Sequence, residues 1–195
     1  MLSGIASELW PGKGIDKRRF VQSWVQFSEP NLSPNLISVP LLAQQLRDDG
    51  KASEAQTIEN ARPEMFGFGN QTVILNGKDV DASELEIVKW VPVLELSFIR
   101  RFSYPAVFYE HVRSSLFHEW KLSPKTTGIP MTSFPAGVSY VNRLDTANMA
   151  ISRRVIHFHM EWLADVVRSI AANSANLITS GKTLSLPTIW WIEGG

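Results

Sequence analysis

One short segment in the second half of the chain carries side chains of the types that bind metal ions. His157, His159 and Glu161 are spaced two residues apart, and residues two apart share one face of a β-strand. Two neutral imidazoles and a carboxylate on one face suit Zn, Fe or Mn. In an α-helix the two histidines would diverge by about 200° and could not share an ion. The sequence leaves undecided whether residues 154–162 form a strand or a helix. The helical spacing of apolar residues extends over a longer part of the sequence than the strand alternation, so we expect no metal site.

An arginine precedes a histidine by five residues at two places in the chain. The two pairs are Arg113 with His118 and Arg154 with His159. This spacing resembles the Arg-x4-6-His motif of the HEPN nucleases. The resemblance implies an all-helical ribonuclease in which the arginine stabilises the phosphorane charge and the histidine moves the proton. Val155 follows the second arginine where the family has a polar residue, and the β-rich segments 71–91 and 184–192 do not suit an all-helical fold. An Arg/His ribonuclease is therefore an alternative interpretation.

Positive charge and aromatic rings are combined in residues 98–122. Arginine and lysine bind phosphates, and each unstacked base on an aromatic ring contributes about 1–3 kcal/mol. The residues expected to contact RNA or another polyanion are Arg100, Arg101, Tyr104, Arg113, Trp120, Lys121, Arg153 and Arg154. Many of these rings also have the spacing of a helix that faces a core, and paired arginines often form salt bridges. A structural role is therefore the alternative.

The charge of the chain is zero in sum but uneven along its length. Residues 1–97 carry 9 Lys and Arg against 13 Asp and Glu, a difference of −4, while residues 98–195 carry 10 against 6, a difference of +4. Such asymmetry indicates a polyanionic partner or association of one copy's acidic half with another copy's basic half.

Several classes of protein are excluded or disfavoured by what the sequence lacks. With no cysteine there is no disulfide scaffold, no thiolate metal site and no cysteine nucleophile, which fits a reducing, cytoplasmic setting. The sequence contains no Gly-x4-Gly-Lys-Ser/Thr, no Gly-x-Gly-x-x-Gly and no Gly-x-Ser-x-Gly motif, so we expect no cofactor and lean against an enzyme. No apolar run is long enough to span a bilayer, so we expect no membrane partner.

The pattern of apolar residues predicts an α+β fold that is mostly helical. We expect an N-terminal arm over residues 1–14 and a single globular domain over 15–195, with a small antiparallel hairpin within 71–99 and a C-terminal strand. Asn76-Gly77 is the strongest hairpin signal in the chain. The expected helices cover 16–27, 40–48, 52–61, 104–121 and about 145–174. The expected strands cover 71–75, 78–81, 84–91, 138–141 and 184–192, and after Pro92 either a second strand or a helix follows.

These features favour a non-catalytic binding or assembly subunit. We expect a homo-oligomer or a larger complex, of nucleoprotein type, in which the basic and aromatic region contacts RNA or another polyanion. One alternative is a protein–protein adaptor that binds no nucleic acid, with Trp10, Trp190 and Trp191 at the interface. The other alternative is the enzyme, either the Arg/His ribonuclease or the His/Glu metal site.

Overall fold

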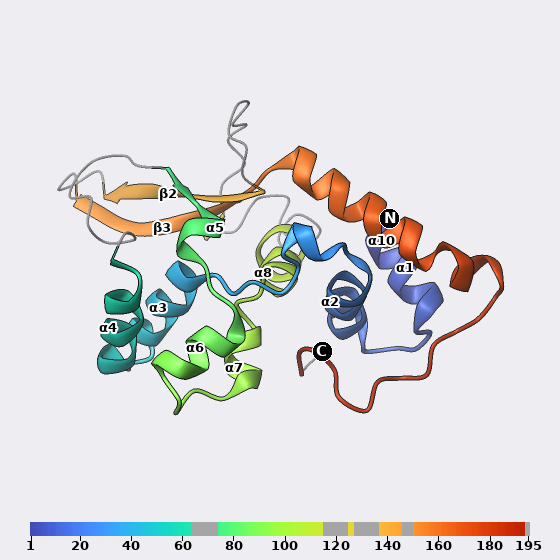
Figure 1. The fold of residues 1–195 in the computed structure, drawn as a ribbon, viewed down its shortest axis with the longest axis horizontal. Helices are drawn as coiled ribbons and strands as arrows, with labels where there is room; N and C mark the ends of the chain where they lie inside the picture. Colours follow the sequence, from blue (N-terminus) through green and yellow to red (C-terminus); the bar gives the residue numbers. More distant parts are fainter. Residues whose placement is uncertain (64–73, 115–124, 127–136, 146–149, 194–195) are drawn as a thin grey trace.

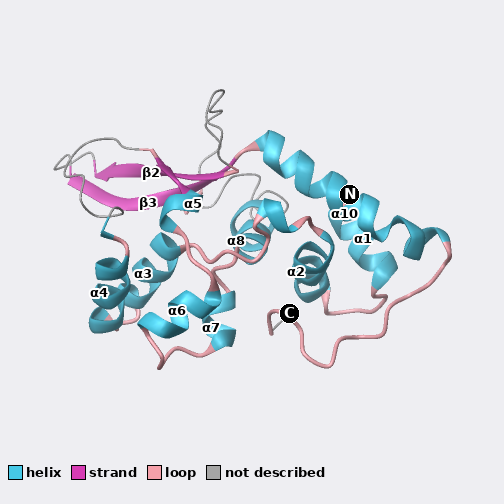
Figure 2. Cartoon of the chain, viewed as in Figure 1, coloured by secondary structure: helices cyan, strands magenta, loops and turns pink. Residues whose placement is uncertain are grey.

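The chain is mostly helical and carries a small antiparallel sheet, as the sequence predicts (Figures 1 and 2). The computed structural model describes residues 1–63, 74–114, 125–126, 137–145 and 150–193. Two hydrophobic cores organise these residues, one among the helices at the two ends of the chain and one beneath the sheet.

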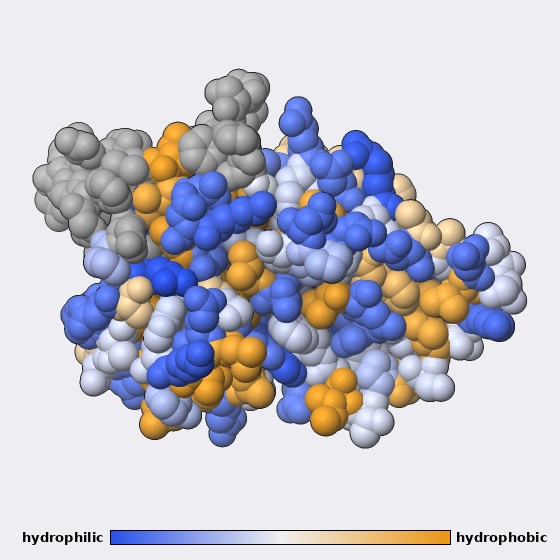
Figure 3. Space-filling model, viewed as in Figure 1, coloured by the Kyte–Doolittle hydropathy of each residue, from blue (hydrophilic) through white to orange (hydrophobic). Residues whose placement is uncertain are grey.

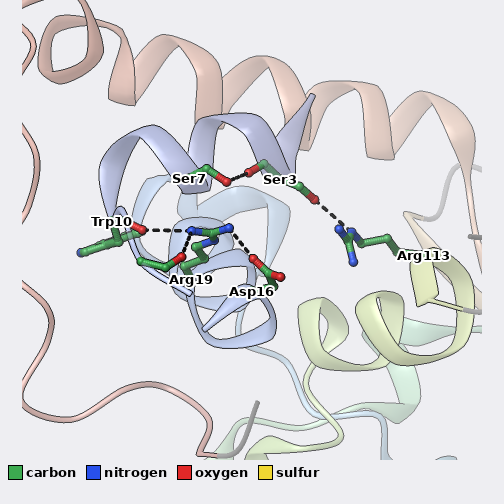
Figure 4. Close-up of polar contacts among 7 residues, drawn as sticks. Ser3, Ser7, Trp10, Asp16, Arg19 and Arg113 are labelled. Atoms are coloured by element: carbon green, nitrogen blue, oxygen red, sulfur yellow. Dashed lines mark hydrogen bonds and ion pairs between the residues drawn. The ribbon is translucent and has the colours of Figure 1, made fainter. Parts of the chain in front are cut away.

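The first core lies between helices α1 (Leu2–Leu9), α2 (Asp16–Phe27) and α10 (Met160–Thr179). Its buried members are Leu9, Trp10, Phe20, Val21, Trp24, Phe27, Ala106, Val166, Ile170 and Ile192. Arg19 closes the turn between α1 and α2, because its Nη1 donates to the carbonyls of Gly12 at 3.1 Å and Trp10 at 3.3 Å (Figure 4). Residues 2–9, expected within a loose arm, are therefore a helix that helps to build this core.

The second core fills the space between the sheet and a group of shorter helices. These are α3 (Val39–Asp48), α4 (Ala52–Ala61), α5 (Gly77–Val80), α6 (Glu84–Trp90), α7 (Leu96–Arg100) and α8 (Tyr104–Phe108). The turn η1 (Pro30–Leu32) links the two cores, and α8 runs on into the π-helical turn η3 (Tyr109–Ser114). The helices predicted over 16–27, 40–48 and 52–61 are confirmed to within one residue.

The sheet contains β1 (Leu75–Asn76), β2 (Val138–Asp145) and β3 (Ala150–Phe158) in that order, all antiparallel. In the β2–β3 register Tyr140 lies opposite Ile156, and both side chains are fully buried in the second core. Lys125 accepts a backbone hydrogen bond from Ile156 at 3.0 Å, so residues 125–126 lie along the outer edge of β3.

The hairpin predicted within 71–99 is wrong for the residues that the structure describes there. The side chain of Asn76 accepts a hydrogen bond from Lys78 N at 3.0 Å and thereby caps α5, so the Asn-Gly pair starts a helix. Residues 84–90, expected as a strand, form α6. Ser83 and Glu86 form a capping box at its start, which the Ser-x-x-Glu spacing indicates.

The long helix predicted from residue 145 begins only at Met160, because residues 150–158 form β3. The strand interpretation of residues 154–158 is therefore confirmed. The strand predicted over 184–192 is wrong, since that segment pairs with no other strand among the described residues and turns back beneath α1 and α2 (Figure 1). No helix in the described part of the chain is long and apolar enough to cross a membrane.

Candidate functional site

Arg100, one of the residues predicted to contact a polyanion, is held by partners within the chain. Its guanidinium makes two hydrogen bonds to Glu84, at 2.8 Å from Nε and 3.3 Å from Nη2. Its Cζ also lies 4.4 Å from the ring centre of Trp191. These contacts neutralise and fix the side chain, so Arg100 joins α6, α7 and the C-terminal segment.

Arg101 and Arg113 differ in how far they are engaged. Arg101 is exposed and lies 5.9 Å from the ring centre of Phe98. Arg113 donates from Nε to Ser3 Oγ at 2.9 Å and packs 4.6 Å from the ring centre of Tyr109, which points it at α1 (Figure 4). In the described part of the basic and aromatic segment, α8 and η3 therefore pack against the N-terminal helices.

Two aromatic residues predicted to face a partner are buried instead. Tyr104 is 2% exposed and its ring packs edge-on against Phe158 and Trp162, so it cannot stack on a base. Trp10, expected as an interface anchor, is buried in the first core against Phe27. Trp120 and Lys121 lie outside the described residues, as does His118.

The remaining predicted cations belong to the sheet. The register places Arg143 directly opposite Arg153 and places Asn142 opposite Arg154. Two arginines thus lie opposite each other at one position of the β2–β3 ladder, and Arg154 lies at the adjacent position. Arg154 shares a face with the buried Ile156, and partial burial lowers its pKa. The register irregularity between Arg143 and Leu144 comes directly after this pair.

The two histidines predicted as metal ligands do lie together. The ring centres of His157 and His159 are 4.7 Å apart and edge-on, and Ser139 Oγ lies 2.9 Å from His159 Nε2. All three side chains are buried, and burial together with the neighbouring His157 lowers the pKa of His159. Among the described residues, however, no three His, Cys, Asp or Glu side chains gather where an ion could bind.

The second Arg-x4-His pair does not have the helical setting that the nuclease resemblance implies. Arg154 lies within β3, and His159 follows the end of that strand as the residue that precedes α10. An odd spacing along a strand sends two residues to opposite faces. In the first pair, Arg113 lies within η3 and His118 lies outside the described residues.

A buried carboxyl group, which sequence reasoning missed, lies at the centre of the second core. Asp81 Oδ2 accepts hydrogen bonds from the hydroxyls of Tyr104 at 2.6 Å and Tyr140 at 2.7 Å, and its Oδ1 accepts one from Val39 N at 3.0 Å. Ser38 Oγ lies 2.7 Å from the Tyr140 hydroxyl. We call Ser38, Asp81, Tyr104 and Tyr140 the Asp81 cluster.

The Asp81 cluster joins the start of α3, the end of α5, the start of α8 and strand β2. The backbone supports it, since Ile37 N donates to Ala82 O at 2.9 Å and Tyr104 N donates to Leu36 O at 3.1 Å. Burial raises the pKa of Asp81 to about 7, against the lowering effect of its hydrogen bonds from Tyr104 and Tyr140. No short-range motif marks these residues, since they come from four separate segments. Every cluster side chain is buried, so we assign the cluster a positioning role.

Comparison of the chain with protein-family models, with curated proteins and with solved structures found no match.

Proposed function

We propose that the chain is a non-catalytic binding and assembly subunit that contacts RNA or another polyanion through the β2–β3 ladder. The observation that carries the proposal is the cross-strand pairing of Arg143 with Arg153. Like charges directly opposite each other weaken a strand pair. A phosphate group bound between them would turn this repulsion into two attractive contacts, and phosphate contacts supply most of the affinity for nucleic acid.

The composition of the ladder supports this choice of surface. Strands β2 and β3 together carry three arginines and one acidic residue, Asp145, which the register places opposite Ala150. The sequence of the ladder is therefore basic in sum, and phosphate is the group that such a composition favours.

The proposal is tested by the salt dependence of RNA binding. Fluorescence anisotropy with labelled oligo(U) would be measured at several salt concentrations for the parent and for Arg143→Ala/Arg153→Ala. We expect weaker binding and a log–log salt slope that is shallower by about 0.7, the contribution of one neutralised phosphate on a single strand, because the two arginines share one phosphate. Thermal stability should stay equal or rise, because the substitution also removes the cross-strand repulsion.

The matched control is Lys89→Ala/Arg168→Ala, which removes two exposed cations on α6 and α10 and leaves the sheet unchanged. It should bind oligo(U) with the parent's affinity and slope. Equal losses in the ladder variant and the control would mean that binding follows net charge alone. Unchanged binding in the ladder variant would exclude the ladder as the contact surface.

A protein–protein adaptor without nucleic acid is the second candidate, and an exposed apolar corner favours it. Leu85, Val93 and Leu96 are exposed where α6 turns into α7, and apolar surface gathers over these helices (Figure 3). For an adaptor, Leu85→Ser/Val93→Ser should abolish association while Arg143→Ala/Arg153→Ala leaves it unchanged. The opposite result would favour the polyanion-binding subunit.

A further inference from the structure

The segment that follows α10 ends in a short apolar stretch docked against the rest of the chain. We call residues Trp190–Ile192 the tip. Trp191 N donates to Gln22 Oε1 at 3.0 Å, and Trp191 Nε1 donates to Ser103 Oγ at 3.3 Å. Trp190 packs edge-on against Trp10 at 5.9 Å, and Ile192 is buried. The residues that contact the tip are Trp10, Gln22, Ser103 and Arg100, whose guanidinium lies over the Trp191 ring. We call these four residues the tip site.

The linker between α10 and the tip is attached far more loosely. It leaves the helix at Gly181, whose φ of +63° is the left-handed conformation that ends helices, and Leu184 N ties it to Leu9 O at 2.8 Å. Pro187 holds the preceding residue extended, so residues 182–189 can span up to about 26–29 Å. Figure 1 shows the linker running clear of α10 before it returns beneath α1 and α2.

The linker also exposes apolar side chains that its present position leaves in water. Leu186 is 59% exposed and Ile189 is 75% exposed. In a symmetric pair of copies that exchange their tips, two linkers would pass each other in opposite directions and could cover these side chains. The tip contacts themselves would be the same as within one chain, so burial of Leu186 and Ile189 is a gain that only the exchanged form has.

We propose that the tip of one copy docks in the tip site of a second copy, so that the chain assembles by exchange of residues 182–193. This inference rests on the assembly role proposed above and gives that role a surface and a partner, a second copy of the same chain. Within one copy the tip competes at an effective concentration of the order of millimolar, which makes exchange a property of concentrated protein.

The test uses the absence of cysteine in the natural sequence. Gln26→Cys, exposed on α2 one turn from Gln22, places one thiol beside the tip site and keeps the Gln22 contact. Glu193→Cys, in a second and tagged copy, places one beside the tip. The two variants are mixed at high concentration, incubated and treated with a short bismaleimide. Exchange predicts a covalent heterodimer, since neither copy can form this link within itself. Gln56→Cys, exposed on α4, replaces Gln26→Cys in the control and should give only background product.

A heterodimer yield no higher than in the Gln56→Cys control would overturn the proposal, even if light scattering shows a dimer, because that dimer would use another surface. A second variant, Leu186→Ser/Ile189→Ser, keeps the tip and should shift the mass measured by light scattering toward the monomer. An unchanged mass would show that Leu186 and Ile189 of the linker do not stabilise the assembly. Oligo(U) binding, measured at concentrations where the chain is monomeric, reports on the ladder separately, so the two proposals fail in distinguishable ways.

Discussion

The hydroxyl of Tyr140 and the carboxyl of Asp81, 59 residues apart in the sequence, meet at 2.7 Å in the interior of the second core. Tyr140 comes from β2 and Asp81 follows α5, so this hydrogen bond fixes the sheet onto the helices that cover it. The same carboxyl accepts from Val39 N and therefore caps α3 from a distant part of the chain.

Tyr140→Phe is expected to lower the free energy of unfolding by about 1–3 kcal/mol, the usual cost of leaving a buried polar group without its partner. The substitution removes the phenol that lies within hydrogen-bond distance of both Asp81 and Ser38. Urea denaturation followed by tryptophan fluorescence would measure the loss. Tyr109→Phe, which keeps the ring contact with Phe20, is the control and should change stability by less than about 0.5 kcal/mol. Equal effects of the two substitutions would contradict a special role for Tyr140.

The stability of the chain should depend on pH through Asp81. Its folded pKa of about 7 lies above the ordinary value of 3.8, so the folded state favours the protonated acid. The stabilisation is complete below pH 3.8 and is lost as pH rises toward 7, at up to about 1.4 kcal/mol per pH unit. His111 acts in the opposite sense, because burial lowers its pKa to about 4 and its protonation below pH 6.5 disfavours folding.

Asp81→Asn separates these two contributions. The difference in unfolding free energy between the variant and the parent should change steadily between pH 5 and pH 7 in favour of the variant, because asparagine cannot ionise. Chemical denaturation at each pH gives this difference. A difference that is independent of pH would show that the carboxyl of Asp81 does not titrate in this range.

Gly77→Ala should destabilise the chain because the glycine lies against the Asp81 cluster. A Cβ atom there would lie 2.6 Å from the Tyr104 hydroxyl and 3.1 Å from Val138 O. Overpacking of this kind costs about 1–3 kcal/mol. Gly4→Ala, in α1 with no heavy atom within 4 Å of the added Cβ, should instead stabilise the chain by about 0.5–1 kcal/mol. Melting temperatures that move in the same direction for both variants would contradict this comparison.

Arg100→Ala should destabilise the chain more than Arg101→Ala. Arg100 is partly buried between Glu84 and Trp191, so its loss removes a two-hydrogen-bond ion pair and a ring contact, together worth about 1–2 kcal/mol. Arg101 is exposed, and its loss should cost less than about 0.5 kcal/mol. Thermal denaturation of both variants checks the order. The reverse order would mean that the ion pair with Glu84 contributes nothing measurable.

Helices α2, α3 and α4 follow from the sequence alone, whereas α1 does not. Phe20, Trp24 and Phe27 repeat at helical spacing within α2, and Pro40 lies in the first turn of α3, where its missing N–H costs nothing. The strand β2 was also predicted, although it extends four residues further than expected. In each case the residues that favour the helix or strand lie within a few positions of one another, so the local pattern of the sequence indicates the element.

The candidate surface was only partly predictable. Arg153 and Arg154 are visible in the sequence, but their relation to Arg143 depends on the register of two strands. Residues 154–162 fit both a helix and a strand, and the helical pattern covers the longer window, but pairing with β2 decided for a strand up to Phe158. Arg100 was predicted for a partner because nothing in the sequence indicates Glu84 and Trp191 as its contacts.

The sequence by itself determined helices α2, α3 and α4, the uneven charge and the gathering of arginine, histidine and aromatic residues in the second half. Only the tertiary structure decided that Tyr104 and Trp10 are buried, that residues 150–158 form a strand, and that Asp81 connects four segments. The physical reason is the range of the interactions. Propensities and caps act between neighbours in the chain, whereas strand register, ion pairing and burial depend on residues that meet only after the whole chain has folded.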